Sequence, residues 1–263
     1  MDKNKIRELL DRKADEYNQP SFIAADPIAV PHRFRKKQDI EIAGFFAAIF
    51  AWGNRTTILN KSKELMRLMH DAPHDFCLHH GKKDLQSLLQ FKHRTFNATD
   101  LLYFIEFFKS HYQQQESLES AFTRHGPTVE AMFTGFHHYF FSLEHIPERS
   151  RKHIASPEKK STCKRLNMFL RWMVRRDNKG VDFGIWENIS PAVLICPIDL
   201  HVARVALQLG ILKSSQYKGG HPDWNTALAL TDYLRTLDSE DPVKYDFALF
   251  GLGAIEPRAK HLE

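Results

Sequence analysis

Apolar residues recur at spacings of three and four positions in one segment after another, as they do in helices with one buried face. No repeat at solenoid periods interrupts this pattern. The single strand-like stretch, AVLICPI at 192–198, is too short and too isolated to found a sheet. The pattern therefore predicts an all-α protein.

Helix start and stop signals divide the first half of this pattern. Asp2 is placed to cap a helix that runs to about Tyr17, and a proline-punctuated loop follows. Asp39 then precedes IEIAGFFAAIFAW at 40–52, which is hydrophobic nearly all round and is therefore expected at the centre of the core. Gly53 can supply the left-handed residue after this helix, and Thr56 or Thr57 can cap the next one.

The second half reads as further helices separated by short loops. A basic amphipathic helix is expected at about 161–176. Asp199 and Asp223 each precede a helical pattern, and Asp241 with Pro242 opens the last one.

Composition describes a folded protein with no sign of a membrane segment. The chain has 263 residues, of which 43% are hydrophobic, so it can bury a core without disulfides. Its longest apolar stretch, 42–52, is far shorter than a bilayer requires, and the charged N-terminus lacks a signal-peptide core. A cytoplasmic location is expected. The three cysteines are far apart in sequence and are expected to be buried thiols: Cys77, Cys163 and Cys196.

The net charge of +5 is a weak indication of nucleic-acid binding, but the charge is concentrated. Residues 150–176 contain many lysines and arginines and one glutamate. Lys164, Arg171 and Arg175 fall at spacings that place them near one helix face, where they could contact phosphates. Trp172 and Trp186 are candidate surfaces for base stacking, although tryptophan in such apolar surroundings is more often part of a core.

The segment CPIDLHVARVALQLG at 196–210 has two interpretations. Asp199 before a helix is first of all an N-cap. The segment also resembles the helix-hairpin-helix DNA glycosylase superfamily, in which a D-x-H-x-x-R pattern carries the catalytic carboxylate; here Asp199, His201 and Arg204 match it. The resemblance implies that Asp199 is catalytic and that His201 and Arg204 lie at the DNA.

Two further segments agree with this resemblance in chain order. Residues 45–66 are similar to the superfamily's early core helix and turn, where Asn54 or Arg55 would enter the DNA-facing cleft. KYDFALFGLGA at 244–254 is similar to the last helix of the adenine-glycosylase branch. The resemblance implies a single glycosylase-like unit of two helical lobes, one at about 40–150 and the other formed by 1–39 with 151–263.

The chain departs from the superfamily in three places. The interval NKGVDFGIWENISPAVLI, at 178–195, lacks the G-x-G of the phosphate-gripping hairpin, so the hairpin is divergent. No lysine lies where the family places the imine-forming one, and Arg171 stays protonated and cannot replace it, so no lyase step is expected. The four-cysteine cluster is missing, and the final Leu262 and Glu263 are typical of residues added in cloning.

Several of these segments together resemble more narrowly an uncharacterised bacterial family, known mainly as a domain of unknown function. They are CKRLNMFLRWMVR, VDFGIW, CP-x-D-x-H-x-x-R and KYDFALFGLG.

The sequence thus favours a DNA-binding, base-excision-repair-like protein whose substrates include damaged duplexes. It would be a monofunctional N-glycosylase with Asp199 as its carboxylate, no cofactor and no metal. One alternative is a nucleic-acid-binding module without catalysis. The other is a metal-dependent phosphohydrolase with ligands at His70–Asp71, His74–Asp75 and His79–His80. Pro73 disfavours it because it breaks the helical spacing between the first two pairs. The sequence does not indicate the lesion, a preference for DNA over RNA, or the oligomeric state.

Overall fold

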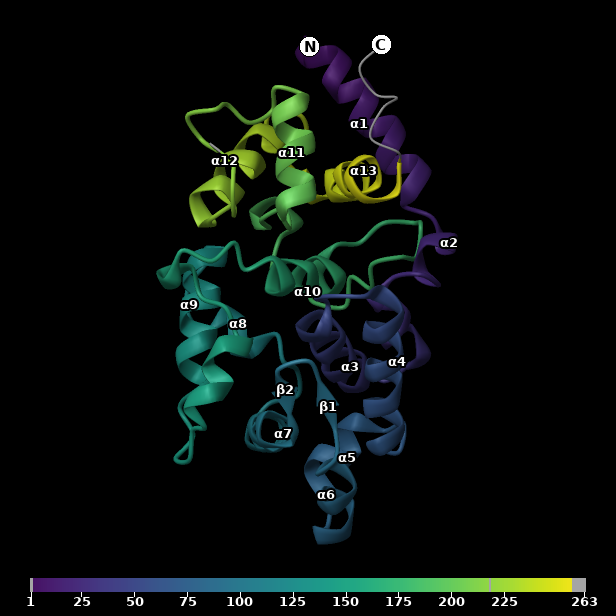
Figure 1. Cartoon of the computed structure of the whole chain (residues 1–263), viewed down its shortest axis with the longest axis vertical. Helices are drawn as coiled ribbons and strands as arrows, with labels where there is room; N and C mark the ends of the chain where they lie inside the picture. Colours follow the sequence, from purple (N-terminus) through teal and green to yellow (C-terminus); the bar gives the residue numbers. More distant parts are fainter. Residues whose placement is uncertain (1, 218, 257–263) are drawn as a thin grey trace. The chain divides into compact units, whose positions relative to one another are not determined.

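The computed structural model describes residues 2–217 and 219–256. Leu262 and Glu263 lie outside the described residues. Helices make up most of the described chain, which confirms the predicted all-α class (Figure 1). The chain divides into two compact units, and each is described by itself. The continuous unit comprises residues 23–156, and the discontinuous unit combines the residues up to Phe22 with those from Pro157 onward.

The continuous unit contains α3 to α9, three short 3₁₀ helices and one minimal hairpin. Its elements are η1 (Pro27–Ala29), η2 (Pro31–Arg33), α3 (Lys37–Phe50), α4 (Arg55–Leu68), α5 (Pro73–His79), α6 (Lys82–Leu88), β1 (Lys92–His93), β2 (Phe96–Asn97), α7 (Ala98–Tyr112), α8 (Ser120–Thr123), α9 (Val129–Phe140) and η3 (Glu148–His153). The segment 23–39 belongs to this unit because η1 and η2 pack against α3.

Helix α3 is the central core helix, as its sequence predicts. Every residue from Ile40 to Phe50 is buried. Phe45 contacts aromatic rings of both α7 and α9, among them Phe108 and Phe140. The helix starts at Lys37, slightly before the expected Asp39, and ends at Phe50. Burial on all sides explains why this segment has little hydrophobic asymmetry.

A buried carboxylate ties α3 to the end of α7 and the loop after it. Glu41 is fully buried and accepts hydrogen bonds from the Tyr112 hydroxyl (2.9 Å), the Ser117 hydroxyl and the Leu118 amide (3.1 Å). A buried charge persists only where such partners compensate its lost hydration. The apolar pattern alone did not indicate this contact.

The turn after α3 corrects one expected cap. Asn54, and neither Thr56 nor Thr57, caps α4: its side-chain oxygen accepts a hydrogen bond from the Thr57 amide at 3.1 Å. Gly53 has a φ of 104°, a conformation that favours glycine, and it lies three residues beyond the end of α3. The strands β1 and β2 pair antiparallel over two residues each and were not predicted.

The discontinuous unit is assembled from both ends of the described chain. Its elements are α1 (Lys3–Tyr17), α2 (Pro20–Ile23, whose last residue falls in the other unit), η4 (Pro157–Lys159), α10 (Lys164–Val174), η5 (Pro191–Val193), α11 (Leu200–Gln208), α12 (Trp224–Arg235), η6 (Pro242–Lys244), α13 (Tyr245–Phe250) and the π-helical turn η7 (Gly251–Ile255).

Helix α13 lies at the core of this unit. The apolar face of α1, formed by Ile6, Leu10 and Ala14, is buried, and α1 packs along α13 (Figure 1). Helix α11 also packs on α13 and on η7. The N-terminal helix therefore packs on segments more than two hundred residues away in sequence. One such contact is a hydrogen bond from Arg7 to the Leu237 carbonyl at 2.7 Å.

The structure also bears on the cysteines, on the strand-like stretch and on membrane-spanning helices. Cys77, Cys163 and Cys196 are free and buried, as predicted. Residues 192–198 form no strand. Within the described ranges, no helix is both long and apolar enough to cross a membrane.

Candidate functional site

Asp199 lies at the start of α11 and uses both of its carboxylate oxygens. Its Oδ1 accepts hydrogen bonds from the amides of His201 (2.9 Å) and Val202 (3.0 Å), so the predicted N-cap is present. Its Oδ2 accepts a hydrogen bond from Lys164 Nζ on α10 at 2.6 Å. The Asp199 side chain remains 30% exposed and that of Lys164 29%. The pair is therefore accessible and held on two different helices.

The surroundings keep Asp199 ionised. Partial burial acts to raise the pKa of this carboxyl, but the charge and hydrogen bond of Lys164 and the two helix amides outweigh it. The resulting pKa lies below its usual value. Asp199 is consequently a carboxylate at neutral pH, suited to stabilising a nearby positive charge and unsuited to donating a proton.

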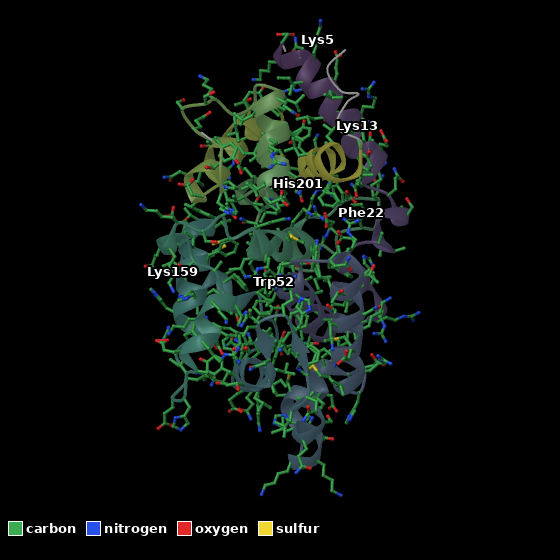
Figure 2. All side chains as sticks on the ribbon, in the orientation of Figure 1. Lys5, Lys13, Phe22, Trp52, Lys159 and His201 are labelled. Atoms are coloured by element: carbon green, nitrogen blue, oxygen red, sulfur yellow. The ribbon has the colours of Figure 1, made fainter. Side chains whose placement is uncertain are left out.

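The other two members of the D-x-H-x-x-R pattern lie on the same helix. His201 and Arg204 are exposed on α11, and His201 is labelled in Figure 2. Within the described chain, neither side chain has a hydrogen-bond or ion-pair partner. Their polar groups are thus available to a ligand, whereas Asp199 and Lys164 are already paired.

Asn54 and Arg55 are also exposed, but they belong to the continuous unit. Asn54 is occupied as the cap of α4. Arg55 begins that helix. Their predicted contact with nucleic acid stays a prediction.

Arg171 and Arg175 do not present their guanidinium groups to solvent, which corrects their expected role as phosphate contacts. Each is 4% exposed. Arg171 pairs with Asp246 and with Asp182 at 3.3 Å. Arg175 donates to Asp182 at 3.2 Å, and it also pairs with Asp177 and Asp241 at 2.6 and 2.8 Å. The two arginines lie near one face of the helix, as their spacing predicts, but that face contacts buried aspartates and not solvent.

Trp172 and Trp186 are core residues, so they offer no surface for stacking on a base. They are 1% and 2% exposed. The Trp186 ring meets Phe169 edge-on at 5.3 Å, and its amide donates to the Met173 carbonyl at 2.9 Å. The loop after α10 thus folds back on that helix, as the alternative interpretation of the tryptophans expected.

The acidic partners of α10 are residues beside the candidate site that the sequence did not single out. Asp246 lies within KYDFALFGLGA, and Asp182 lies within VDFGIW. Burial raises the pKa of Asp246 to about 6, against the opposing charges of Arg171 and Lys164. Lys164 therefore interacts electrostatically with both Asp199 and Asp246. The sequence did offer one signal for these partners. Asp182 and Asp246 are isolated acidic residues in otherwise apolar motifs, and such residues, when buried, need cationic partners of the kind that the arginines near 171–176 provide.

A π-helical turn lies against the start of α11. Glycine at 253 leaves room for this contact: a Cβ there would come within 3.3 Å of the His201 carbonyl carbon and oxygen. Single π-helical turns are frequent at functional sites. The LGA ending of the predicted last helix thus forms part of the surroundings of His201.

The histidine–aspartate pairs do not gather around one point. His70 and Asp71 follow α4 with left-handed φ values of 58° and 50°. His79 instead pairs with Asp75 along α5 at 2.9 Å. No group of three or more His, Cys, Asp or Glu side chains suited to a metal ion occurs within residues 2–217 and 219–256.

The fold and this site define a mostly helical protein with an accessible carboxylate–lysine pair next to a buried network of aspartates and arginines. Residues 26–255 match the family described as "Protein of unknown function (DUF2400)", and the chain belongs to that family, as the narrower of the two resemblances predicted. No curated protein and no solved structure matches the chain. Nothing in these comparisons links the family to the helix-hairpin-helix glycosylases.

Proposed function

We propose that this protein binds DNA and hydrolyses an N-glycosidic bond with Asp199 as the essential carboxylate. The observation that supports the proposal is the state of Asp199, which is ionised, partly exposed and fixed by two backbone amides and a lysine. A fixed carboxylate can stabilise the positive charge that develops on a sugar as its base departs, and it can orient the attacking water.

Cationic side chains of the same unit supply contacts for a phosphate backbone. Arg204 is exposed on α11, and Lys159 and Lys160 are exposed just before α10. Lys159 is labelled in Figure 2. Each cation that neutralises a phosphate releases a counterion, so binding would weaken as salt rises. Arg171 and Arg175 have no part in this surface because their partners are buried aspartates.

The alternative is a nucleic-acid-binding protein that performs no chemistry. The double use of Asp199 as N-cap and ion-pair partner favours it, since both contacts are also sufficient structural reasons for an aspartate here. The two functions differ in what Asp199→Asn should change. Asparagine also caps helices well, so this substitution removes the charge and keeps the cap.

The experiment compares two matched duplexes, one undamaged and one with an abasic-site analogue, each at several salt concentrations. Preferential binding of the abasic duplex would support a pocket for a flipped nucleotide, and it would be followed by a screen of damaged bases. In that screen, Asp199→Asn should reduce base release by roughly 10²-fold or more. Arg204→Ala should lower the dependence of log affinity on log salt by about one phosphate contact.

Asp223→Asn is the matched control. Asp223 caps α12 in the same unit by accepting from the Thr226 amide at 2.9 Å, as Asp199 caps α11. Release of a base that is lost in Asp199→Asn and kept in Asp223→Asn would support catalysis by the Asp199 charge. Preferential abasic binding without release from any damaged duplex would favour the non-catalytic alternative. Equal, weak binding to both duplexes would contradict the repair function.

A further inference from the structure

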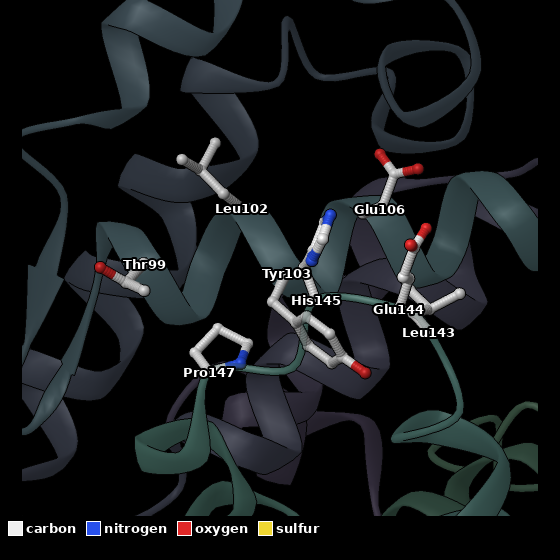
Figure 3. Close-up of a pocket in the computed structure, with 8 residues that line it drawn as sticks. All are labelled: Thr99, Leu102, Tyr103, Glu106, Leu143, Glu144, His145 and Pro147. Atoms are coloured by element: carbon white, nitrogen blue, oxygen red, sulfur yellow. The ribbon is translucent and has the colours of Figure 1, made fainter.

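The continuous unit contains a pocket that the proposed function does not use. Its volume is about 580 Å³, within the range of small-molecule sites. One wall is a single face of α7, where Thr99, Leu102, Tyr103 and Glu106 follow at helical spacing. The other is the segment after α9, which contributes Leu143, Glu144, His145 and Pro147 (Figure 3).

The floor of the pocket is apolar and fixed. Tyr103 is 5% exposed, and its ring stacks on Phe141 at 5.8 Å. Its hydroxyl donates to the Phe140 carbonyl at 2.8 Å, so that group is already satisfied. Leu102, Leu143 and Pro147 are half-buried around it. This surface suits a hydrocarbon body and offers it no competing hydrogen bond.

The charged end of the pocket is acidic. In the view of Figure 3, the carboxylates of Glu106 and Glu144 lie toward one end, and Thr99 and Pro147 lie toward the other. Across the described residues, neither glutamate has an ion-pair or hydrogen-bond partner. The two arginines that follow the lining segment are already engaged: Arg149 pairs with Asp100 at 3.4 Å, and Arg151 pairs with Glu148 and lies over the Phe141 ring at 5.1 Å. His145 also belongs to the lining.

We propose that this pocket binds a small organic cation, a primary amine on an apolar body. The ammonium group would lie between Glu106 and Glu144, and the apolar body would lie along Leu102, Tyr103 and Leu143. Two unpaired carboxylates next to an apolar wall favour a cation and repel a phosphate, so nucleic acid is not the occupant. The site is separate from Asp199, and its test is independent of the proposed function.

The experiment is a titration of the full-length protein with three probes of one shape, followed by ligand-observed NMR. Phenethylamine carries the positive charge, phenethyl alcohol is neutral, and phenylacetate is negative. We expect phenethylamine to bind about tenfold more tightly than either of the others, and methylamine, which lacks the apolar body, to bind more weakly than phenethylamine.

Substitutions test the carboxylates and the apolar wall of the pocket one at a time. Glu106→Gln and Glu144→Gln should each weaken phenethylamine binding about threefold, and the double variant by about tenfold, because exposed carboxylates make modest ion pairs. Glu130→Gln, at an exposed position of α9 outside the pocket, should leave it unchanged. Leu102→Trp, checked for folding by circular dichroism, should block the apolar wall and weaken binding of all the aromatic probes.

Three outcomes would overturn the proposal. The first is no binding of phenethylamine. The second is equal binding of phenethylamine and phenethyl alcohol, which would show that charge is not recognised. The third is equal loss in Glu130→Gln and in the double glutamate variant, which would indicate a general effect of surface charge.

Discussion

Asp246 is a residue whose ionisation the fold opposes. Burial raises its pKa to about 6, from 3.8 for an ordinary aspartate, despite the neighbouring Arg171. Between about pH 4 and pH 6 the folded protein therefore binds more protons than the unfolded chain, and the unfolding free energy falls as the pH rises. Below this window the contribution of Asp246 is fully present, and above it the contribution is lost.

This predicts a difference between the wild type and Asp246→Asn that depends on pH. The unfolding free energy of the wild type relative to the variant should fall by about 3 kcal/mol as the pH rises across the window, because asparagine does not titrate. Urea unfolding at small pH steps measures it. A flat difference between the wild type and Asp246→Asn would contradict the buried network described for α10.

At the scale of single residues, the sequence identified Asp199 as an N-cap and placed Lys164, Arg171 and Arg175 on one helix face. It did not show that Lys164 reaches Asp199 or that the two arginines reach Asp182 and Asp246. These partners are between 7 and 75 positions apart in sequence. Spacing within a helix determines which side chains share a face, but not which distant segment that face meets.

At the scale of elements, the junction of α13 and η7 depends on close backbone packing. A Cβ built at Gly251 would lie 2.1 Å from the ring of Tyr17 on α1, too close for any real contact. The ring cannot simply leave, because its hydroxyl donates to Glu256 at 2.7 Å. Gly251 is thus needed for the approach of α1 rather than for an unusual φ, which is −57°.

Gly251→Ala should therefore lower the unfolding free energy by about 1–3 kcal/mol through overpacking, even though alanine is the better helix former. Gly253→Ala is a milder change in the same turn, since its nearest atoms lie at 3.3 Å, and it should cost less. Thermal and urea unfolding of both variants give the comparison. Equal stability of Gly251→Ala and the wild type would mean that α1 does not pack on this turn as described.

The sequence predicted most helices well where a cap or an apolar stripe marked them. The caps at Asp199 and Asp223 and the buried helix at 40–50 are examples. It was less successful where a helix end depends on its neighbours. Asp2 occupies the N-cap position of α1 without making a side-chain cap bond, and Asn54 caps α4 in place of a threonine. The hairpin β1–β2 is too short to leave a periodic signal.

At the scale of the whole molecule, the two units differ in how the chain builds them. Residues 23–156 form the continuous unit with α3 at its centre, whereas the other unit needs α1 to cover α13. A fragment of residues 23–156 should thus be helical and unfold cooperatively by itself. A fragment starting at Pro157 should be less structured and should gain helix when a peptide of residues 2–22 is added. Circular dichroism of the fragments measures both, and a fully folded fragment from Pro157 onward would contradict the covering role of α1.

The sequence by itself determined the all-α class, the central helix, the buried thiols and the carboxylate at the start of α11. Each of these is a local property, since periodicity, a cap or an apolar run can be read within one segment. Only the tertiary structure decided which cations stay exposed, which are neutralised by buried aspartates, and which faces of α7 and the segment after α9 leave a pocket open. Those outcomes depend on contacts between distant segments, and ion pairing and burial change the chemistry of a side chain without changing its place in the pattern.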